Sequence, residues 1–205
     1  MKRNAIGISI GLLIAALLFS CVPKHPVSLF NNGIVRDPAL VHGILPNGFQ
    51  YLLMENRTPK DQVTVHLNIF AGSVNETDAE QGVAHYLEHM LFKGTSSFGT
   101  LNWEKEKPLL AQIENIYETY RKTTDVKLRK KLYHQIDSIS GVAATFAIAN
   151  EYDKMISSLG AKSTNAYTWV EQTVYVNDIP ANELEKWMYV ESERFSELVL
   201  RLFHT

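Results

Sequence analysis

The stretch AHYLEHMLFKGT, residues 84–95, places two histidines and a glutamate within five positions of the chain. Residues four apart lie beside each other on a helix, so His85 and His89 can each turn a ring nitrogen towards one ion. Neutral imidazole suits zinc, and four-coordination leaves room for a water molecule. Glu88 lies one step round the helix, where its carboxylate can take a proton from that water. The pattern predicts a metal site that carries its own general base.

The helix that carries these residues is expected to be amphipathic. Thr77 and Glu80 fit a capping box, so the helix is predicted to start near Asp78, and Gly94 is expected to end it. We expect the helix to pack on a sheet by its aliphatic side and to present the three polar groups on the opposite side. The aliphatic side comprises Val83, Leu87, Met90 and Leu91. From spacing alone, the solvated face of an ordinary surface helix remains the alternative to a metal site.

Three stretches around this helix have strand character. In LPNGFQYLLMEN, residues 45–56, Asn47-Gly48 predicts a hairpin turn, and apolar residues follow it. VTVHLNIF, residues 63–70, alternates as a half-buried strand does. STNAYTWVEQTVYVND, residues 163–178, is rich in the threonine, tyrosine, tryptophan and valine that strands favour.

Residues 101–159 carry apolar side chains at helical spacing in two runs. The polar stretch RKTTDVKLRKK, residues 121–131, is interpreted as the join between two antiparallel helices. A last helix is expected after Pro180. Strands and helices in mixed order predict an α+β fold: an antiparallel sheet with helices packed on one face and a helical-hairpin insertion.

The composition is that of a globular protein. The chain has 205 residues, 45% of them hydrophobic and 20% charged, and a net charge of −2. These values suit one main domain with a sizeable core. No basic excess is present, so a nucleic-acid partner is not expected.

The N-terminus is predicted to direct export. Lys2 and Arg3 precede an apolar run over residues 5–19, which is typical of a secretory signal peptide. Cys21, the single cysteine, lies where the lipidated cysteine of a bacterial lipobox stands. We therefore predict a lipoprotein signal peptide over residues 1–20, a tether over 21–38 and one globular domain over 39–205. An uncleaved anchor helix, or a plain signal with an incidental cysteine, remains the alternative.

The sequence GVAHYLEHMLFKGT, residues 82–95, resembles the active-site helix of the inverzincins, the pitrilysin and insulin-degrading-enzyme family of zinc metallopeptidases. The resemblance continues into three flanking stretches and covers roughly residues 43–203. LPNGFQYLLMEN is similar to the hairpin that opens the family's domain, and FAGSVNE to the strand end before its active helix. TNAYTWVEQTVY is similar to the strand that runs past the active site.

The resemblance implies a role for each matching residue. His85 and His89 are implied as ligands of one Zn²⁺, and Glu88 as the general base. Manganese or cobalt would fit the same ligand types. Asn165 and Ala166 match the edge strand where a substrate peptide adds as an extra strand, and plain sheet residues remain the alternative for them. Glu171 is expected to be supporting or structural.

Two features of the family are expected to lie outside this chain. The third zinc ligand is a glutamate on a later helix, expected beyond Thr205; Glu191, Glu193 and Glu197 are weaker candidates. Family members resemble a clamshell of two or more related domains, and this chain is less than one half, incomplete at its C-terminal end. A second peptidase-family domain or subunit is therefore an expected partner.

The resulting hypothesis is a zinc-dependent metalloendopeptidase that hydrolyses peptides or unfolded polypeptides, held at the membrane by a lipid anchor and facing the periplasm of a bacterium. The 205-residue chain alone is expected to be inactive. One alternative is a non-catalytic peptide-binding or partner subunit with the same fold. Another is a fragment with no activity of its own.

Overall fold

The structure is a computed structural model, and it describes residues 37–202 of the chain. The chain divides into two compact units, Met1–Arg57 and Thr58–Thr205. The predicted signal peptide, Cys21 and nearly all of the predicted tether lie outside the described residues. Within residues 37–202, no helix combines the length and the apolar character needed to cross a membrane.

The described part of the first unit is a two-stranded antiparallel hairpin. Strand β1 (Leu40–Ile44) pairs with strand β2 (Gln50–Met54). Between them Gly48 has a φ of 88°, a left-handed conformation that glycine adopts without steric cost, and its N–H donates to the carbonyl of Leu45 at 2.8 Å. The hairpin turn predicted at Asn47-Gly48 is confirmed.

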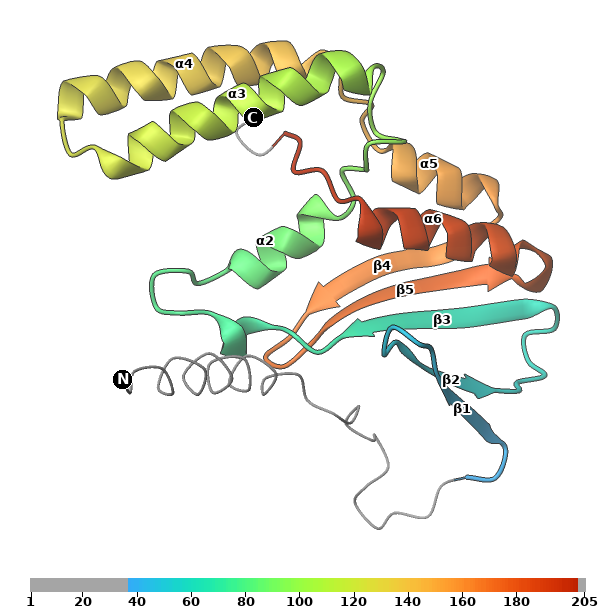
Figure 1. The fold of residues 1–205 in the computed structure, drawn as a ribbon. Helices are drawn as coiled ribbons and strands as arrows, with labels where there is room; N and C mark the ends of the chain where they lie inside the picture. The colour runs from blue at the N-terminus through green and yellow to red at the C-terminus, as the bar shows by residue number, and fades with distance from the viewer. Residues whose placement is uncertain (1–36, 203–205) are drawn as a thin grey trace, which may run out of the picture. The chain divides into compact units, whose positions relative to one another are not determined.

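The second unit is built on a three-stranded antiparallel sheet with the strand order β3-β5-β4 (Figure 1). Its strands are β3 (Gln62–Ile69), β4 (Lys162–Thr168) and β5 (Thr173–Pro180). The apolar positions of β3 are half-buried and the positions between them are exposed, so the predicted half-buried strand is confirmed. The strand-like stretch 163–178 proves to be a hairpin of two strands, with the central and most buried strand, β5, as its second arm.

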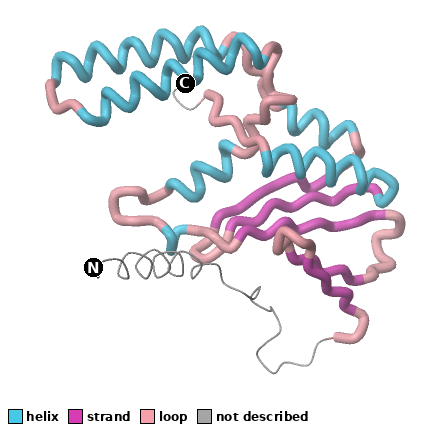
Figure 2. Tube along the Cα trace, in the orientation of Figure 1, coloured by secondary structure: helices cyan, strands magenta, loops and turns pink. Residues whose placement is uncertain are grey.

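Three helices lie over one face of this sheet (Figures 1 and 2). They are α2 (Val83–Met90), α5 (Glu151–Ser158) and α6 (Leu184–Ser196). Two single 3₁₀ turns, η1 (Ser73–Asn75) and η2 (Ala181–Glu183), precede α2 and α6. The core between helices and sheet is formed by Phe98, Tyr152, Ile156, Ile179, Trp187 and Val190. The predicted α+β class, with an antiparallel sheet and a one-sided helical layer, is confirmed.

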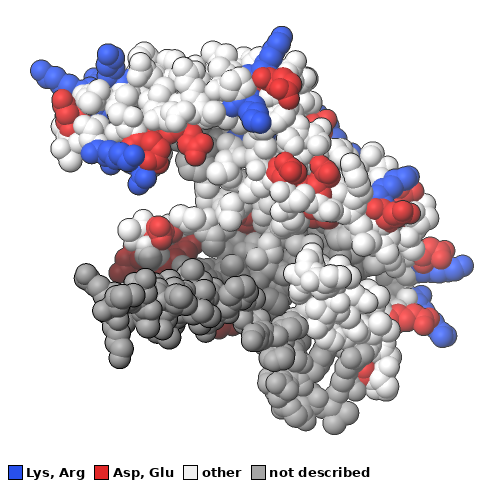
Figure 3. Space-filling view, in the orientation of Figure 1, with Lys and Arg blue, Asp and Glu red and all other residues white. Residues whose placement is uncertain are grey.

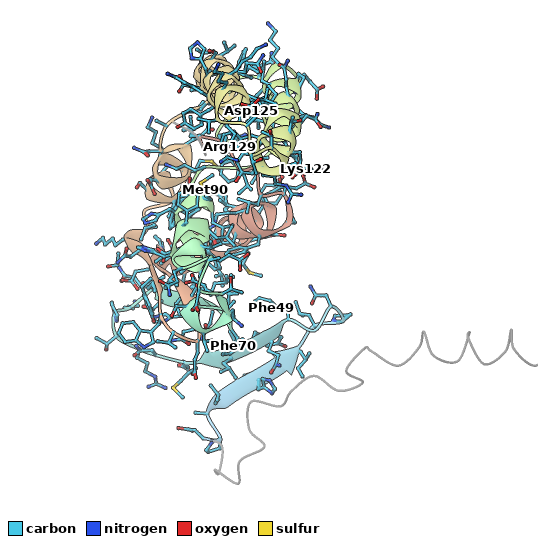
Figure 4. The ribbon with its side chains drawn as sticks, turned by 90° about the vertical axis from the view of Figure 1, so that its left-hand side faces the viewer. Phe49, Phe70, Met90, Lys122, Asp125 and Arg129 are labelled. Atoms are coloured by element: carbon cyan, nitrogen blue, oxygen red, sulfur yellow. The ribbon has the colours of Figure 1, made fainter. Side chains whose placement is uncertain are left out.

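The predicted helical-hairpin insertion is also present. Helices α3 (Trp103–Lys122) and α4 (Val126–Ala144) pack on each other around a separate small core of Ile113, Ile136 and Ala143. Figure 4 looks onto the tip of this hairpin, and Figure 3 shows lysine and arginine side chains gathered there. At the tip Arg129 donates to the carbonyl oxygens of Tyr120 and Thr123 and lies 3.9 Å above the Tyr120 ring. The basic stretch 121–131 is thus the joint of the two helices.

Candidate metal and peptide site

Helix α2 begins at Val83 and not near Asp78, because Glu76 rather than Thr77 caps it. The two carboxylate oxygens of Glu76 accept hydrogen bonds from the backbone N–H groups of Gly82 and Ala84, both at 2.8 Å. These two donors hold the pKa of Glu76 below its ordinary value. Gly82 has a φ of 91°, a left-handed conformation that separates the helix from the preceding turn.

The orientation of α2 differs from the prediction. Met90 and Leu91 are buried as expected, but Val83 is 53% and Leu87 45% exposed. Glu88, expected on the exposed side, is only 5% exposed. The side of the helix that carries Glu88 contacts β4 and β5, and a hydroxyl on β4 donates to this carboxylate.

The two histidines lie side by side on the exposed part of α2. Their Nε2 atoms are 3.1 Å apart and their ring centroids 4.7 Å apart. Two nitrogen ligands at the usual distance from a tetrahedral zinc ion would lie about 3.3 Å from each other. The pair therefore fits two ligand positions of one zinc ion, and the ligand roles of His85 and His89 stay predictions.

Glu88 receives a hydrogen bond that the sequence did not reveal. The hydroxyl of Thr168, the last residue of β4, donates to Glu88 Oε2 at 2.6 Å. Thr168 Oγ1 also lies 3.3 Å from the hydroxyl oxygen of Thr173, and that hydroxyl donates to the carbonyl of Ala71 at 3.0 Å. Thr168 belongs to the same short stretch as Asn165 and Ala166, but its partner is 80 residues away in the chain.

Strand β4 has an open edge. Among the described strands it pairs with β5 alone, through Asn165 opposite Val176 and Ala166 opposite Tyr175. Asn165 is exposed and Ala166 half-buried. The residues expected to receive a peptide thus lie on an edge strand in contact with α2. Glu171 lies in the turn between β4 and β5 and is exposed.

A shallow cavity of about 280 Å³ opens beside the first histidine. It lies between the start of α2, the turn η1 and the end of β4. Its lining residues are Ser73, Glu76, Gly82, His85, Thr168, Trp169 and Val170. Space for part of a bound molecule therefore adjoins the histidine pair.

The weaker candidates for a third ligand have other partners. Glu191 is buried, accepts a hydrogen bond from the Tyr152 hydroxyl at 2.8 Å and forms an ion pair with Arg194. Glu193 accepts from the Ser97 hydroxyl at 3.1 Å, and Glu197 from that of Ser96 at 3.5 Å. Among residues 37–202, no three histidine, cysteine or acidic side chains are grouped so that they could hold a metal ion.

The sequence of this chain is similar to those of several known peptidases. Residues 51–124 match the sequence profile of the family described as Insulinase (Peptidase family M16). The probable zinc protease PqqL of Escherichia coli (strain K12) is 41% identical over 86 residues, which are 42% of this chain and 9% of that protein. The probable mitochondrial-processing peptidase subunit beta of Arabidopsis thaliana is 36% identical over 100 residues, 49% of this chain and 19% of that protein.

The fold agrees with these relatives. The crystal structure of the first half of the periplasmic protease PqqL from Escherichia coli superposes with a TM-score of 0.54 and 26% identity. The superposition covers 81% of this chain and 26% of that chain. This chain thus spans a small part of the length of its relatives.

The sequence and the fold are therefore both similar to those of known proteases. More specifically, residues 51–124 match the M16, or insulinase, family of peptidases, and the chain is homologous to the PqqL protease and to processing peptidases. The resemblance noted in the sequence is confirmed.

Proposed function

We propose that this chain supplies the metal-binding and peptide-binding part of a zinc-dependent metalloendopeptidase that hydrolyses peptides or unfolded polypeptides. The observation that carries the proposal is the contact of α2 with the open edge strand β4. It puts His85, Glu88 and His89 beside the strand that holds Asn165 and Ala166. Homology to proteins named zinc proteases and processing peptidases supports the same reading.

In this proposal each of the three α2 residues has one task. His85 and His89 hold one Zn²⁺ through their adjacent Nε2 atoms, which fit two ligand positions. A zinc ion held there would lower the pKa of the attacking water molecule to ~7. Glu88 accepts a proton from the attacking water and passes it to the leaving amine.

The peptide lies along β4 as an added strand. Main-chain groups on the open edge of β4, at Asn165 and Ala166, pair with the extended peptide and hold its scissile bond beside α2. Main-chain pairing is independent of side-chain identity, so this edge suits unfolded polypeptides of varied sequence.

The described domain is proposed to act together with a further domain and a membrane anchor. The third zinc ligand is a glutamate outside residues 37–202. A second peptidase-family domain or subunit closes over the substrate, as suggested by the match to one half of PqqL. Lipidation of Cys21 holds the exported protein at the membrane facing the periplasm, and the relative in Escherichia coli is named a periplasmic protease.

Replacement of Glu88 by Gln in the intact native protein tests the mechanism. The variant is expected to lose hydrolysis of an unfolded polypeptide by about 10²–10⁴-fold, the usual contribution of a general base. It is expected to keep its zinc, measured as metal per folded chain. Glu114→Gln, which changes an exposed glutamate on α3, is the matched control and should retain activity.

Hydrolysis retained by the E88Q variant would contradict the mechanism. Zinc-loaded native protein that binds peptide through β4 without turning it over would instead identify a non-catalytic peptide-binding subunit.

A further inference from the structure

We infer that Thr168 is a positioning residue for Glu88, and that β4 thereby aligns both the peptide and the general base. The inference rests on the proposed function, which gives Glu88 its role. It starts from the 2.6 Å hydrogen bond between the Thr168 hydroxyl and Glu88 Oε2.

The direction of this hydrogen bond follows from a count of protons. A hydroxyl has one proton to donate. The proton of Thr173 goes to the carbonyl of Ala71, so Thr168 can choose between Thr173 Oγ1 at 3.3 Å and Glu88 Oε2 at 2.6 Å. The carboxylate is both nearer and charged, and charge-assisted hydrogen bonds are the stronger ones. Thr168 therefore donates to Oε2.

One oxygen of Glu88 is thereby fixed and the other is free to act. The hydrogen bonds among residues 37–202 engage Oε2 and leave Oε1 without a partner. Since Glu88 is only 5% exposed, the hydrogen bond also satisfies an oxygen that little water can reach. In the proposed reaction Oε1 is then the oxygen that takes the proton, held in one orientation by the bond at Oε2.

Thr168 is itself held rigidly. The turn after β4 is closed by the N–H of Trp169, which donates to the carbonyl of Gln172 at 2.7 Å. The N–H groups of Ser73 and Val74 donate to the carbonyls of Trp169 and Val170 at 3.1 and 2.8 Å.

Gly72 lets the backbone of residues 72–74 lie close to the turn after β4. A Cβ added at Gly72 would lie 2.2 Å from the carbonyl oxygen of Trp169, so only glycine fits there. These contacts fix the position from which Thr168 donates.

The consequence is a link between substrate alignment and catalysis. The residues proposed to pair with the peptide, Asn165 and Ala166, precede Thr168 by three and two positions on one strand. A shift of β4 would move the peptide and the base together, so their mutual geometry is preserved. This is a function that a donor on another element could not perform.

Three variants of the intact native protein test the inference. Thr168→Val removes the donor and keeps the branched shape, and is expected to lower kcat about 10- to 100-fold, part of the contribution of a positioned general base. KM, the zinc content and the Kd for an uncleaved peptide are expected to stay within about twofold. Thr168→Ser restores the hydroxyl and should return kcat to near its native value.

Thr164→Val is the matched control. Thr164 lies on the same strand, is equally half-buried, and donates to Asn177 Oδ1 at 3.0 Å, away from α2. It is expected to leave kcat nearly unchanged.

Each other outcome has a defined meaning. A T168V variant with native kcat overturns this inference and leaves the proposed function standing. A T168V variant that loses zinc or peptide affinity in proportion to its activity also overturns it, because Thr168 would then be a structural residue. Native protein that hydrolyses nothing when loaded with zinc overturns both.

Discussion

At the scale of single residues, Glu76 caps the start of α2, the helix that carries the two predicted zinc ligands. Its carboxylate accepts from the N–H groups of Gly82 and Ala84, which have no partner within α2, and its negative charge suits the positive end of the helix dipole. The first predicted ligand, His85, directly follows Ala84. The hydrogen bonds of the Glu76 carboxylate therefore help to fix the position of the histidine pair.

Glu76→Gln is expected to lower the melting temperature at pH 7. Because the folded-state pKa of Glu76 lies below the ordinary 4.5, its stabilisation is complete above about pH 4.5 and is lost as the pH falls through the lower folded pKa. The difference between variant and native protein should therefore shrink below pH 4.5. Thermal melts from pH 3 to pH 7 measure it.

Glu80→Gln is the control for this prediction. Glu80 lies in the same loop and is exposed, and its carboxylate accepts from the hydroxyl of Thr77 and not from the start of α2. Its melting temperature should follow that of the native protein at every pH. A difference between E76Q and native protein that stayed constant across the range would contradict the role of the carboxylate charge.

The residue scale also shows how far the sequence could predict the site. The spacing of His85 and His89 places both imidazoles together, and this is a local property of any helix. The burial of Glu88 is not local, because its hydroxyl partner is 80 residues away. The apolar pattern was right for Met90 and Leu91 but wrong for Val83 and Leu87, which are exposed, while Glu88 is buried.

At the scale of elements, Arg201 joins the segment after α6 to α3 and to the loop after α2. Its guanidinium forms an ion pair with Glu106 in the first turn of α3, with Nε 2.9 Å from Oε1 and Nη2 3.1 Å from Oε2. The same group donates to the carbonyls of Lys93, Thr95 and Phe98 in the loop after α2. Both charged side chains are about 1% exposed, so the segment after α6 is tied to α3 and to the end of α2.

Arg201→Met is expected to destabilise the protein by about 3–5 kcal/mol, because it leaves the buried charge of Glu106 without a partner. Urea denaturation of the intact protein measures the free energy of unfolding. Arg121→Met is the matched control, since its pair with Glu118 has side chains that are 58% and 42% exposed. That surface pair should contribute little to stability, because solvent screens exposed charges. An equal loss of unfolding free energy in the two variants would contradict the stabilising role of the buried Arg201–Glu106 pair.

Elements were predictable to the extent that their signals are local. The α3–α4 hairpin follows from helical spacing of its apolar residues, and its two caps, Asn102 and Asp125, are ordinary capping residues. The turn between β4 and β5, residues 169–172, has no glycine, proline, asparagine or aspartate to signal it. It is held instead by its contact with residues 72–74, a feature of tertiary structure that the local pattern does not contain.

At the scale of the whole molecule, the two predicted histidine ligands lie side by side, and the three candidate glutamates have other partners. Glu191 is bound to Tyr152 and Arg194 inside the core, and Arg194 lies over four aromatic rings there. Burial raises the pKa of the Tyr152 hydroxyl, so this group stays a donor to Glu191. Release of Glu191 to a metal ion would leave a buried guanidinium unpaired, which is costly.

The zinc content of variants of the intact protein is therefore expected to separate the two histidines from the three glutamates. His85→Ala and His89→Ala should each remove most of the bound zinc, because each deletes a ligand that the helix places next to the other. Glu191→Gln, Glu193→Gln and Glu197→Gln should keep one zinc ion per folded chain. Metal analysis after removal of unfolded protein gives the ratio for each variant.

A glutamate variant that lost zinc as completely as the histidine variants would place the third ligand on α6 or at its end, and would require that helix to rearrange. Retention of zinc by all three would place it in a part of the protein other than residues 37–202. The second result is expected because the match to PqqL covers 26% of one half of that protease, so most of its residues have no counterpart in this segment. The edge strand, the base and two ligands would then be one contribution to a site completed elsewhere.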